Sequence, residues 1–478
     1  MKKAVVCLWN FMLQPKRAVI FLTVLAIASG IFWSHNSWGQ PPDGDGVLYN
    51  KMAENFLATH QLSLEEEGGF TISQVSQVVE PLYSFFLAGI YQIFGRGNFD
   101  AVRVVQVFLF ALTVLIIYIL TLDLAGKTVA FFVSVFLIFC FPLAELTGHF
   151  FREVFFTFLV VLLVLALYKS QETTAYFWFF LAGIMLAIAS LLNGVILYFI
   201  FFALACYLML YGRGFVRREK ILKLLLFCLP LLSVMIFWHF ASQWLGAGSL
   251  TEKSGLVLER KVEMMQDVRG GQYYKNLVGQ VFGYYFVDAP DFDYTKFLEP
   301  HRSAEKFLEM AINNYQPSEI SRIFFREDAI YILKNPGSFL AITLLDFLQF
   351  NNPMFINPVN FNVGPMQNLF IKGTHPEIPP AGKVAILIIL RLFYWTFFGF
   401  VIYGLVRAVK EWRKFIWILL IILYFNLVYS AVFGLPRYAI PIYPFYILLF
   451  VMGATTAWNK YVGYNAKKCE SICEMCER

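Results

Sequence analysis

Apolar runs separated by short polar stretches fill most of the sequence, and their lengths are the first guide to the structure. A helix needs about 20 apolar residues to cross the hydrocarbon core of a bilayer. About ten runs approach that length and are predicted to be transmembrane helices, at 17–34, 101–122, 128–147, 153–169, 175–193, 194–211, 221–244, 384–406, 415–433 and 438–458. The pattern therefore predicts an all-α integral membrane protein.

Two longer polar regions, 35–100 and 245–383, interrupt this pattern. The first contains an apolar segment at 81–95 that is short for a span, and we expect it to lie as a helix in the outer interface of the membrane. If that segment crossed the membrane instead, every later span would be inverted. The second region is long enough for a small helical subdomain. The expected organisation is a membrane module over 1–244, an extracytoplasmic subdomain over 245–383, further spans over 384–458 and a cytoplasmic tail over 459–478.

Composition and charge support a membrane protein and set its orientation. Hydrophobic residues make up 59% of the chain and charged residues 15%, against about a quarter charged in soluble proteins. Basic residues cluster beside the apolar runs, and with the spans above all clusters fall on one side, which should be the cytoplasm. This predicts a multi-pass protein of the plasma (inner) membrane with both termini cytoplasmic. No stripe of basic and aromatic residues indicates nucleic-acid binding. The clusters are Lys2, Lys3, Lys16 and Arg17; Arg213, Arg217, Arg218, Lys220 and Lys223; Arg407, Lys410, Arg413 and Lys414; and Lys460, Lys467 and Lys468.

None of the 7 cysteines falls in the long polar regions, so we expect no disulfide framework there. The terminal spacing Cys469, Cys473 and Cys476 resembles iron–sulfur ligation or a zinc site that lacks one ligand. No domain accompanies these three residues, so we expect a reduced cytoplasmic tail.

The first candidate for chemistry is Asp45, which follows the first span and the turn formers Pro41 and Pro42. Behind it, residues 47–60 show apolar positions at helical spacing. An aspartate at the start of such a helix can be an N-cap. It can also be a catalytic base held at the membrane surface, and both interpretations remain open on the residues alone.

Further acidic and basic residues are expected at the same membrane face. Glu80 begins the interfacial helix, and Arg152 and Glu153 occupy a short outward turn. These residues can be a helix-start glutamate and an interfacial arginine that anchors its helix. Together with Asp45, however, the two glutamates could also deprotonate and hold a hydroxyl acceptor.

Arginines near the outer ends of spans are candidates for binding a phosphate. Arg437 stands in Pro436-Arg437-Tyr438, and Arg103 lies at the start of the second span. The planar guanidinium group suits a phosphate because it donates paired hydrogen bonds. Interfacial anchoring is the alternative for both arginines.

Several stretches resemble motifs of the GT-C class of membrane glycosyltransferases, in the protein O-mannosyltransferase-like and lipid A aminoarabinose transferase-like branches. Asp45-Gly-Val-Leu-Tyr49 followed by Ala53 resembles the first-loop motif, and Glu80-Pro-Leu-Tyr resembles the second juxtamembrane segment. Further matching stretches are Ala101-Val-Arg103, Glu153 before an apolar run, 328–340, and Pro436-Arg437-Tyr438 with Pro441 and Pro444. The chain departs from many relatives in having Gly46 where they have a second acidic residue, and Glu80 where they have lysine.

The resemblance implies a GT-C type helical bundle with juxtamembrane helices that uses a polyprenyl-phosphate-linked sugar. In that interpretation Asp45 is the base, Glu153 and Glu80 assist it, and Tyr49, Arg103, Arg152, Arg437 and Tyr438 bind substrates. The expected reaction is an inverting hexosyl or pentosyl transfer to a hydroxyl acceptor, which is a lipid, a glycan or a protein. No cofactor is certain, although two carboxylates could bind a divalent cation.

The rival functions are transport or flipping of a lipid-linked sugar, and a scaffold with a sensing outer domain. Ion-coupled transporters tend to place ionisable residues near the middle of their spans. Here Asp123, Glu145 and Arg391 lie near span ends. This disfavours ion coupling and leaves a passive flippase as the main alternative.

Overall fold

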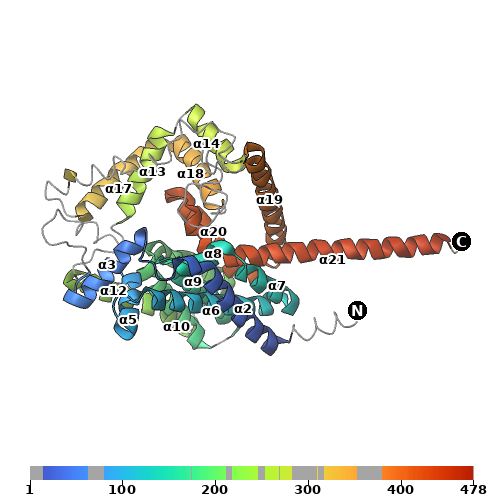
Figure 1. Ribbon diagram of the computed structural model, residues 1–478, viewed down its shortest axis with the longest axis horizontal. Helices are drawn as coiled ribbons and strands as arrows, with labels where there is room; N and C mark the ends of the chain where they lie inside the picture. The colour runs from blue at the N-terminus through green and yellow to red at the C-terminus, as the bar shows by residue number, and fades with distance from the viewer. Residues whose placement is uncertain are drawn as a thin grey trace.

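The computed structural model describes residues 14–62, 80–173, 175–211, 218–245, 253–268, 270–282, 309–310, 317–352 and 379–476. All regular elements in these ranges are helices, as Figure 1 shows. The all-α membrane fold predicted from the apolar pattern is confirmed: within the described residues, seven helices are long and apolar enough to cross a membrane, and a bent pair makes up to eight.

The N-terminal half forms a tight helical bundle. Its most buried member is α9 (Glu153–Glu172), where Val160, Val161 and Leu163 are inaccessible to solvent. Around it lie α2 (Pro15–Ser34), α6 (Phe99–Ala125), α7 (Lys127–Ile138), α8 (Phe141–Glu145), α10 (Tyr176–Leu192), α11 (Phe199–Tyr211) and α12 (Arg218–Leu245). Because apolar residues cover nearly the whole circumference of α9, it packs against neighbours on all sides.

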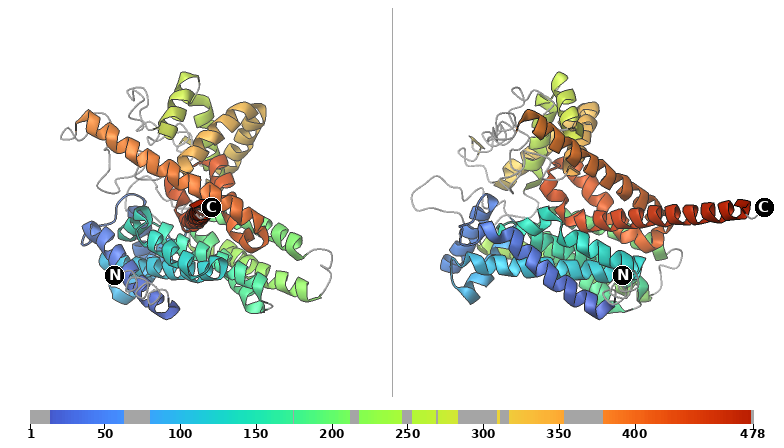
Figure 2. Two further views of the ribbon diagram at one scale, coloured as in Figure 1. Left: turned by 90° about the vertical axis from the view of Figure 1, so that its right-hand side faces the viewer. Right: turned by 45° about the vertical axis from the view of Figure 1, so that its right-hand side comes forward.

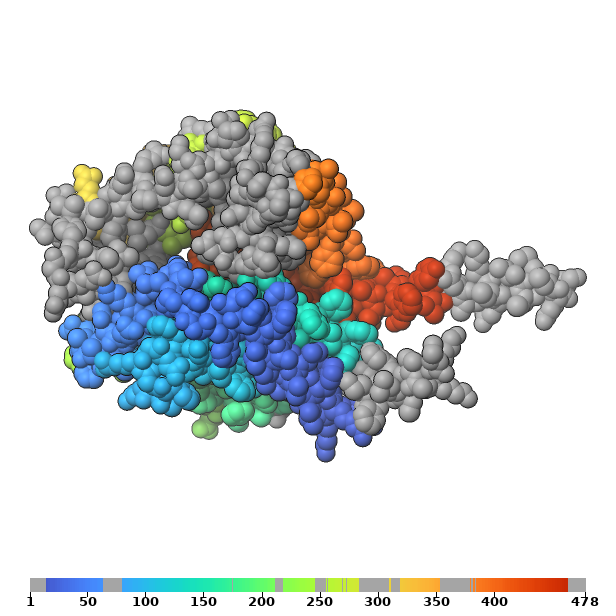
Figure 3. Space-filling model, viewed as in Figure 1, coloured from blue at the N-terminus to red at the C-terminus, as the bar shows by residue number. Residues whose placement is uncertain are grey.

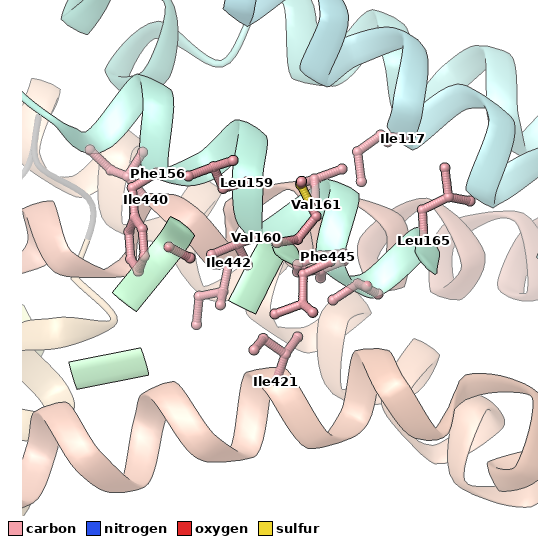
Figure 4. Packing of buried hydrophobic residues seen from close by; sticks show 14 of the residues in the cluster. Ile117, Phe156, Leu159, Val160, Val161, Leu165, Ile421, Ile440, Ile442 and Phe445 are labelled. Carbon is pink, nitrogen blue, oxygen red and sulfur yellow. The ribbon is translucent and has the colours of Figure 1, made fainter. Parts of the chain in front are cut away.

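The C-terminal helices complete the bundle. They are α19 (Pro380–Lys410), α20 (Trp412–Val432), the 3-10 helix η6 (Pro436–Ile442) and α21 (Tyr443–Cys476). Figure 4 shows Leu159 and Val160 of α9 packed close to Ile442 of η6 and Phe445 of α21. The segment that carries Arg437 is thereby packed directly against α9.

All the predicted spans fall on helices, but not all are of full length. The run at 128–147 is divided into Lys127–Ile138 and Phe141–Gly148, with a bend of 55° between them. Two further predicted spans form helices of only 10–17 residues, shorter than a full membrane span. They are Tyr176–Leu192 and Gly194–Leu210. The segment predicted to be interfacial forms α5 (Leu82–Phe94), whose 13 residues span roughly 20 Å. This is less than the hydrocarbon thickness of about 30 Å.

A second layer of helices lies on one side of the bundle, as Figures 1 and 2 show. It consists of α13 (Lys253–Asp267), α14 (Gly271–Phe282), α17 (Pro317–Lys334) and α18 (Pro336–Phe350). The described parts of 245–383 are therefore helical. Val262, Met265, Ile342 and Leu345 form a separate apolar cluster here, which includes Phe433 beyond α20.

The described members of the basic clusters and the first loop lie at opposite ends of the bundle. At one end, Lys169 of α9 pairs with Asp123 of α6, and the Gln171 side chain donates to the backbone carbonyl of Arg413 at 2.7 Å. At the other end, α3 (Asp45–Thr59) packs on α5, and the backbone of Leu62 bonds to Leu245. Figure 3 shows this N-terminal segment, in blue, across the face of the bundle. The helices therefore separate the basic end from the end that carries Asp45.

Candidate active site

Arg437 joins two carboxylates from distant parts of the chain. Its Nη2 donates to Oδ2 of Asp45 at 2.6 Å, across a sequence separation of 392 residues. Its Nε lies 3.0 Å from Oε1 of Glu153. The guanidinium carbon also stands 4.9 Å from the centre of the Phe151 ring. The segment Pro436-Arg437-Tyr438, the first loop and the start of α9 thus meet at one side chain.

Asp45 is the first residue of α3 and the more accessible of the two acids. The N-cap is Gly44, with φ 52°, so the interpretation of Asp45 as the cap residue is wrong. A positive φ favours glycine there, and it turns the chain so that the next carboxylate reaches Arg437. The Asp45 side chain is 51% exposed, against 8% for Arg437. Asp45 is therefore accessible to solvent on one side and paired on the other.

Glu153 occupies the buried side of the same ion pair. It is the first residue of α9, and its side chain is 5% exposed. Its Oε2 has no hydrogen-bond partner among the residues that the structure describes. The helix N-terminus and Arg437 both stabilise its charge. Glu153 is therefore suited to hold Arg437 in place, whereas Asp45 is the carboxylate of the pair that solvent reaches.

A second ion pair adjoins the first. Arg152 Nη1 donates to Glu80 Oε2 at 2.5 Å and to the backbone carbonyl of Leu192 at 3.1 Å. The side chains of Arg152 and Glu80 are 13% and 8% exposed. Because Arg152 directly precedes Glu153, the two pairs are fixed to each other. The three predicted acids Asp45, Glu80 and Glu153 thus each lie beside a predicted arginine.

Tyr49 lies within electrostatic range of both ion pairs. Burial raises the pKa of its hydroxyl above the ordinary value. The positive charge of Arg152 lowers this pKa, and the negative charges of Glu80, Glu153 and Asp45 raise it further. The ring is 7% exposed and meets the Tyr83 ring edge-on at 5.1 Å. The hydroxyl of Tyr49 therefore stays protonated at neutral pH and can act as a hydrogen-bond donor.

Arg103 and Tyr438, also predicted to bind substrate, lie in different settings. Arg103 is 2% exposed, and it donates to the carbonyls of Gly148 at 3.0 Å and Gln40 at 2.6 Å and to Asp100 at 2.8 Å. These bonds tie the first loop to the bundle, so its role in binding phosphate stays a prediction. Tyr438 is part of the site region: its ring stacks on Tyr429 at 5.2 Å, and the Arg437 guanidinium carbon lies 5.7 Å away from it.

Other charged contacts near the site were not anticipated. His149 Nδ1 lies 3.3 Å from Oδ1 of Asp43, and this contact lowers the pKa of Asp43 against the opposing effect of burial. His149 lies three residues before Arg152, and Asp43 lies two residues before Asp45. Their closeness in sequence to predicted site residues is the only feature of the sequence that could have indicated this contact. Lys261 and Asp346 form a second unanticipated pair, which is completely buried.

The arginines supply the counter-charge that a metal ion could otherwise provide. No group of three or more His, Cys, Asp or Glu side chains gathers in the described parts of the chain. Asp45 and Glu153 share Arg437, and Glu80 is paired with Arg152. A divalent cation would have to compete with these guanidinium groups, and its binding stays a proposal. The Cys469, Cys473 and Cys476 side chains lie outside the described residues.

One large groove lies elsewhere in the molecule. It has a volume of about 1190 Å³ and is lined by apolar residues of α7, α19 and α21, with Arg407 and Glu411 among its polar residues. These elements meet at the basic end of the bundle. The groove is therefore separate from the site around Arg437.

The chain is similar to several solved structures. They include the archaeal oligosaccharyltransferase AglB from Archaeoglobus fulgidus, in complex with an inhibitory peptide and a dolichol-phosphate, at 12% identity and a TM-score of 0.47. ArnT from Cupriavidus metallidurans bound to undecaprenyl phosphate matches at 11% identity and a TM-score of 0.38. The matches cover 95% and 91% of this chain, and 52% and 77% of the other chains. The chain thus spans about half the length of the archaeal oligosaccharyltransferase.

No curated protein matches the chain significantly. A family model does match: residues 78–238 fit the model of dolichyl-phosphate-mannose-protein mannosyltransferases. The matched region begins just before Glu80 and includes Arg103, Arg152 and Glu153, and it ends within α12. The resemblance of this chain to the protein O-mannosyltransferase-like GT-C membrane glycosyltransferases is thereby confirmed over residues 78–238.

Proposed function

We propose that the protein transfers a sugar from a polyprenyl-phosphate carrier to a hydroxyl acceptor at the site around Arg437. The observation that carries the proposal is the contact of one buried arginine with both the half-exposed Asp45 and the buried Glu153. A phosphate-binding cation and a candidate base are thereby adjacent, as transfer from a lipid phosphate requires. The family match over 78–238 supports the same class of donor.

The reaction assigns one step to each group. Asp45 accepts the proton of the acceptor hydroxyl while the acceptor oxygen forms a bond to the anomeric carbon of the sugar. The bond between that carbon and the phosphate oxygen breaks, and the polyprenyl phosphate leaves with inversion at the anomeric carbon. Arg437 stabilises the negative charge on the leaving phosphate because a preorganised cation in a buried setting acts strongly on developing charge. Arg152 and the Tyr49 hydroxyl donate further hydrogen bonds.

The site is proposed to face the outside of the plasma (inner) membrane. The starts of α2, α12 and α20 carry Lys16 and Arg17, Arg218 and Lys220, and Arg413 and Lys414. Basic residues beside membrane spans favour the cytoplasmic side. The opposite ends of these helices adjoin the first loop and Arg437. An outward site suits an acceptor that is part of the cell envelope or is displayed on its surface.

Cysteine labelling tests this orientation. With the native cysteines outside the apolar helices replaced by serine, His60→Cys at the end of α3 should react with a membrane-impermeant maleimide in intact cells. Lys410→Cys at the end of α19 should react only after the cells are opened, because it lies at the basic end. Both positions are exposed, so they form a matched pair. The reverse labelling pattern would show that the site faces the cytoplasm.

A transfer assay tests the function itself. Purified protein in lipid vesicles should release polyprenyl phosphate from a panel of polyprenyl-phosphate hexoses and pentoses when membrane extract supplies the acceptor. The same sugars on nucleotide carriers should give no product. Arg437 lies among the membrane helices, so a carrier anchored in the bilayer reaches it and a water-soluble carrier does not. Mass spectrometry of acceptor and released lipid measures the result. Sugar lipid that crosses the vesicle membrane without forming a glycosidic product would identify a flippase instead.

A further inference from the structure

A fully buried ion pair links the second layer of helices to the membrane bundle. Lys261 of α13 donates from Nζ to Oδ2 of Asp346 in α18 at 2.5 Å, and the two side chains are 0% and 1% exposed. The same Lys261 Nζ donates to the backbone carbonyl of Ser430 near the end of α20, at 2.9 Å. One ammonium group therefore ties α13, α18 and α20 together.

The chain just before Arg437 packs against this pair. A Cβ added at Gly434 would stand 2.2 Å from the backbone oxygen of Asp346, so only glycine allows this approach. The Gly434 amide also stabilises the charge of the Asp346 carboxylate. Phe433 belongs to the apolar cluster of α13 and α18, and the Arg260 guanidinium carbon lies 4.1 Å from the centre of its ring. The segment 430–434 is therefore held on several sides.

The physical cost of this pair indicates a role in geometry. Removing a lysine and a carboxylate from water is costly, and apolar residues of similar volume often stabilise a protein as well or better. An ion pair has defined partners and directions, whereas apolar packing tolerates shifts. Only two residues separate Gly434 from Arg437, so a shift at Gly434 passes directly to the guanidinium group between Asp45 and Glu153.

We propose that Lys261 and Asp346 are positioning residues that place Arg437 for binding the phosphate of the lipid donor. The proposal rests on the function proposed above. Through these two side chains, the helices α13 and α18 control the location of the segment that carries Arg437. Loss of the pair leaves Arg437 present but displaced from the donor phosphate.

Binding of undecaprenyl phosphate to detergent-purified protein tests the proposal. The double variant Lys261→Met/Asp346→Leu removes both charges together, because a single substitution would leave one buried charge unpaired. We expect affinity to fall by at least about tenfold, the loss typical of a charge-assisted hydrogen bond. The matched control Lys169→Met/Asp123→Asn removes an ion pair at the basic end and should leave the affinity unchanged.

Combination with Arg437→Gln separates positioning from a general structural effect. If the pair acts through Arg437, the triple variant should bind no more weakly than Arg437→Gln alone, because coupled changes are not additive. Fully additive losses, or wild-type affinity in the folded double variant, would overturn the proposal. If Arg437→Gln itself binds undecaprenyl phosphate like the wild type, the proposed function fails rather than the positioning role.

Two further measurements apply if the double variant does not fold. Gly434→Ala keeps both charges and displaces the same segment, so it should weaken binding similarly; wild-type affinity in this variant contradicts the proposal. In the wild type, hydrogen exchange should slow on lipid binding both in 430–438 and in α13 around Lys261. Protection confined to 430–438 would show that α13 is not coupled to the site.

Discussion

Asp45→Asn should reduce sugar transfer by about 10²–10⁴-fold, the range for loss of a general base. The amide keeps the shape of the side chain but does not accept the proton of the acceptor hydroxyl. Donor binding should persist, because Arg437 and its contact with Glu153 remain. Stability should change by about 1 kcal/mol or less, since half-exposed ion pairs contribute little. Transfer rates and the affinity for undecaprenyl phosphate, measured on the same preparation, check both parts.

Glu54→Gln is the matched control for this prediction. Glu54 lies on the same helix α3, is half-buried, and accepts a hydrogen bond from Asn50 at 3.0 Å. It has no contact with Arg437, so its replacement should leave the transfer rate nearly unchanged. Equal rates for Asp45→Asn and Glu54→Gln would remove Asp45 as the base. The acceptor proton would then have to pass to a different group.

Arg437→Gln should have two separable effects, on donor binding and on stability. Loss of the guanidinium removes the cation proposed to hold the lipid phosphate, so affinity should fall by about tenfold or more. It also leaves Glu153 as a buried carboxylate without its counter-charge. Breaking a buried ion pair in this way costs about 3–5 kcal/mol. The variant should therefore unfold at a clearly lower temperature than the wild type.

A second substitution separates the two effects. Arg437→Gln/Glu153→Gln removes the uncompensated charge and should recover most of the thermal stability, while binding of undecaprenyl phosphate stays weak. Arg103→Gln is the comparison, because Arg103 is equally buried but bonds to Asp100, Gly148 and Gln40. Its loss of stability should not be recovered by Glu153→Gln. Recovery of donor binding in the Arg437 and Glu153 double variant would contradict the phosphate-binding role.

The sequence by itself determined where the helices lie and which charged residues are candidates for the site. Apolar runs form helices because a membrane requires every backbone group to be hydrogen-bonded within the segment, and this is a local property of each run. The predicted run at 153–169 coincides with α9, and the run at 415–433 coincides with α20. The predicted and observed helix ends differ by at most three residues. Charged residues near span ends predicted a role for Asp45, Glu153 and Arg437, and the motif resemblance supported it. The break at residues 139–140, however, depends on how α7 and α8 pack, and the apolar pattern predicts one continuous span there.

Only the tertiary structure decided which acid meets which arginine. Asp45 and Arg437 are separated by 392 residues, and no local pattern encodes that distance. Partners also distinguish two similarly buried arginines: Arg103 ties the first loop to the bundle, whereas Arg437 bridges two acids. The Lys261 and Asp346 pair could not be predicted, because Lys261 is one of many charges on the polar helix α13 and Asp346 lies on the separate apolar helix α18. Its partners come from three elements, and the free energy of a buried charge depends on all of them at once.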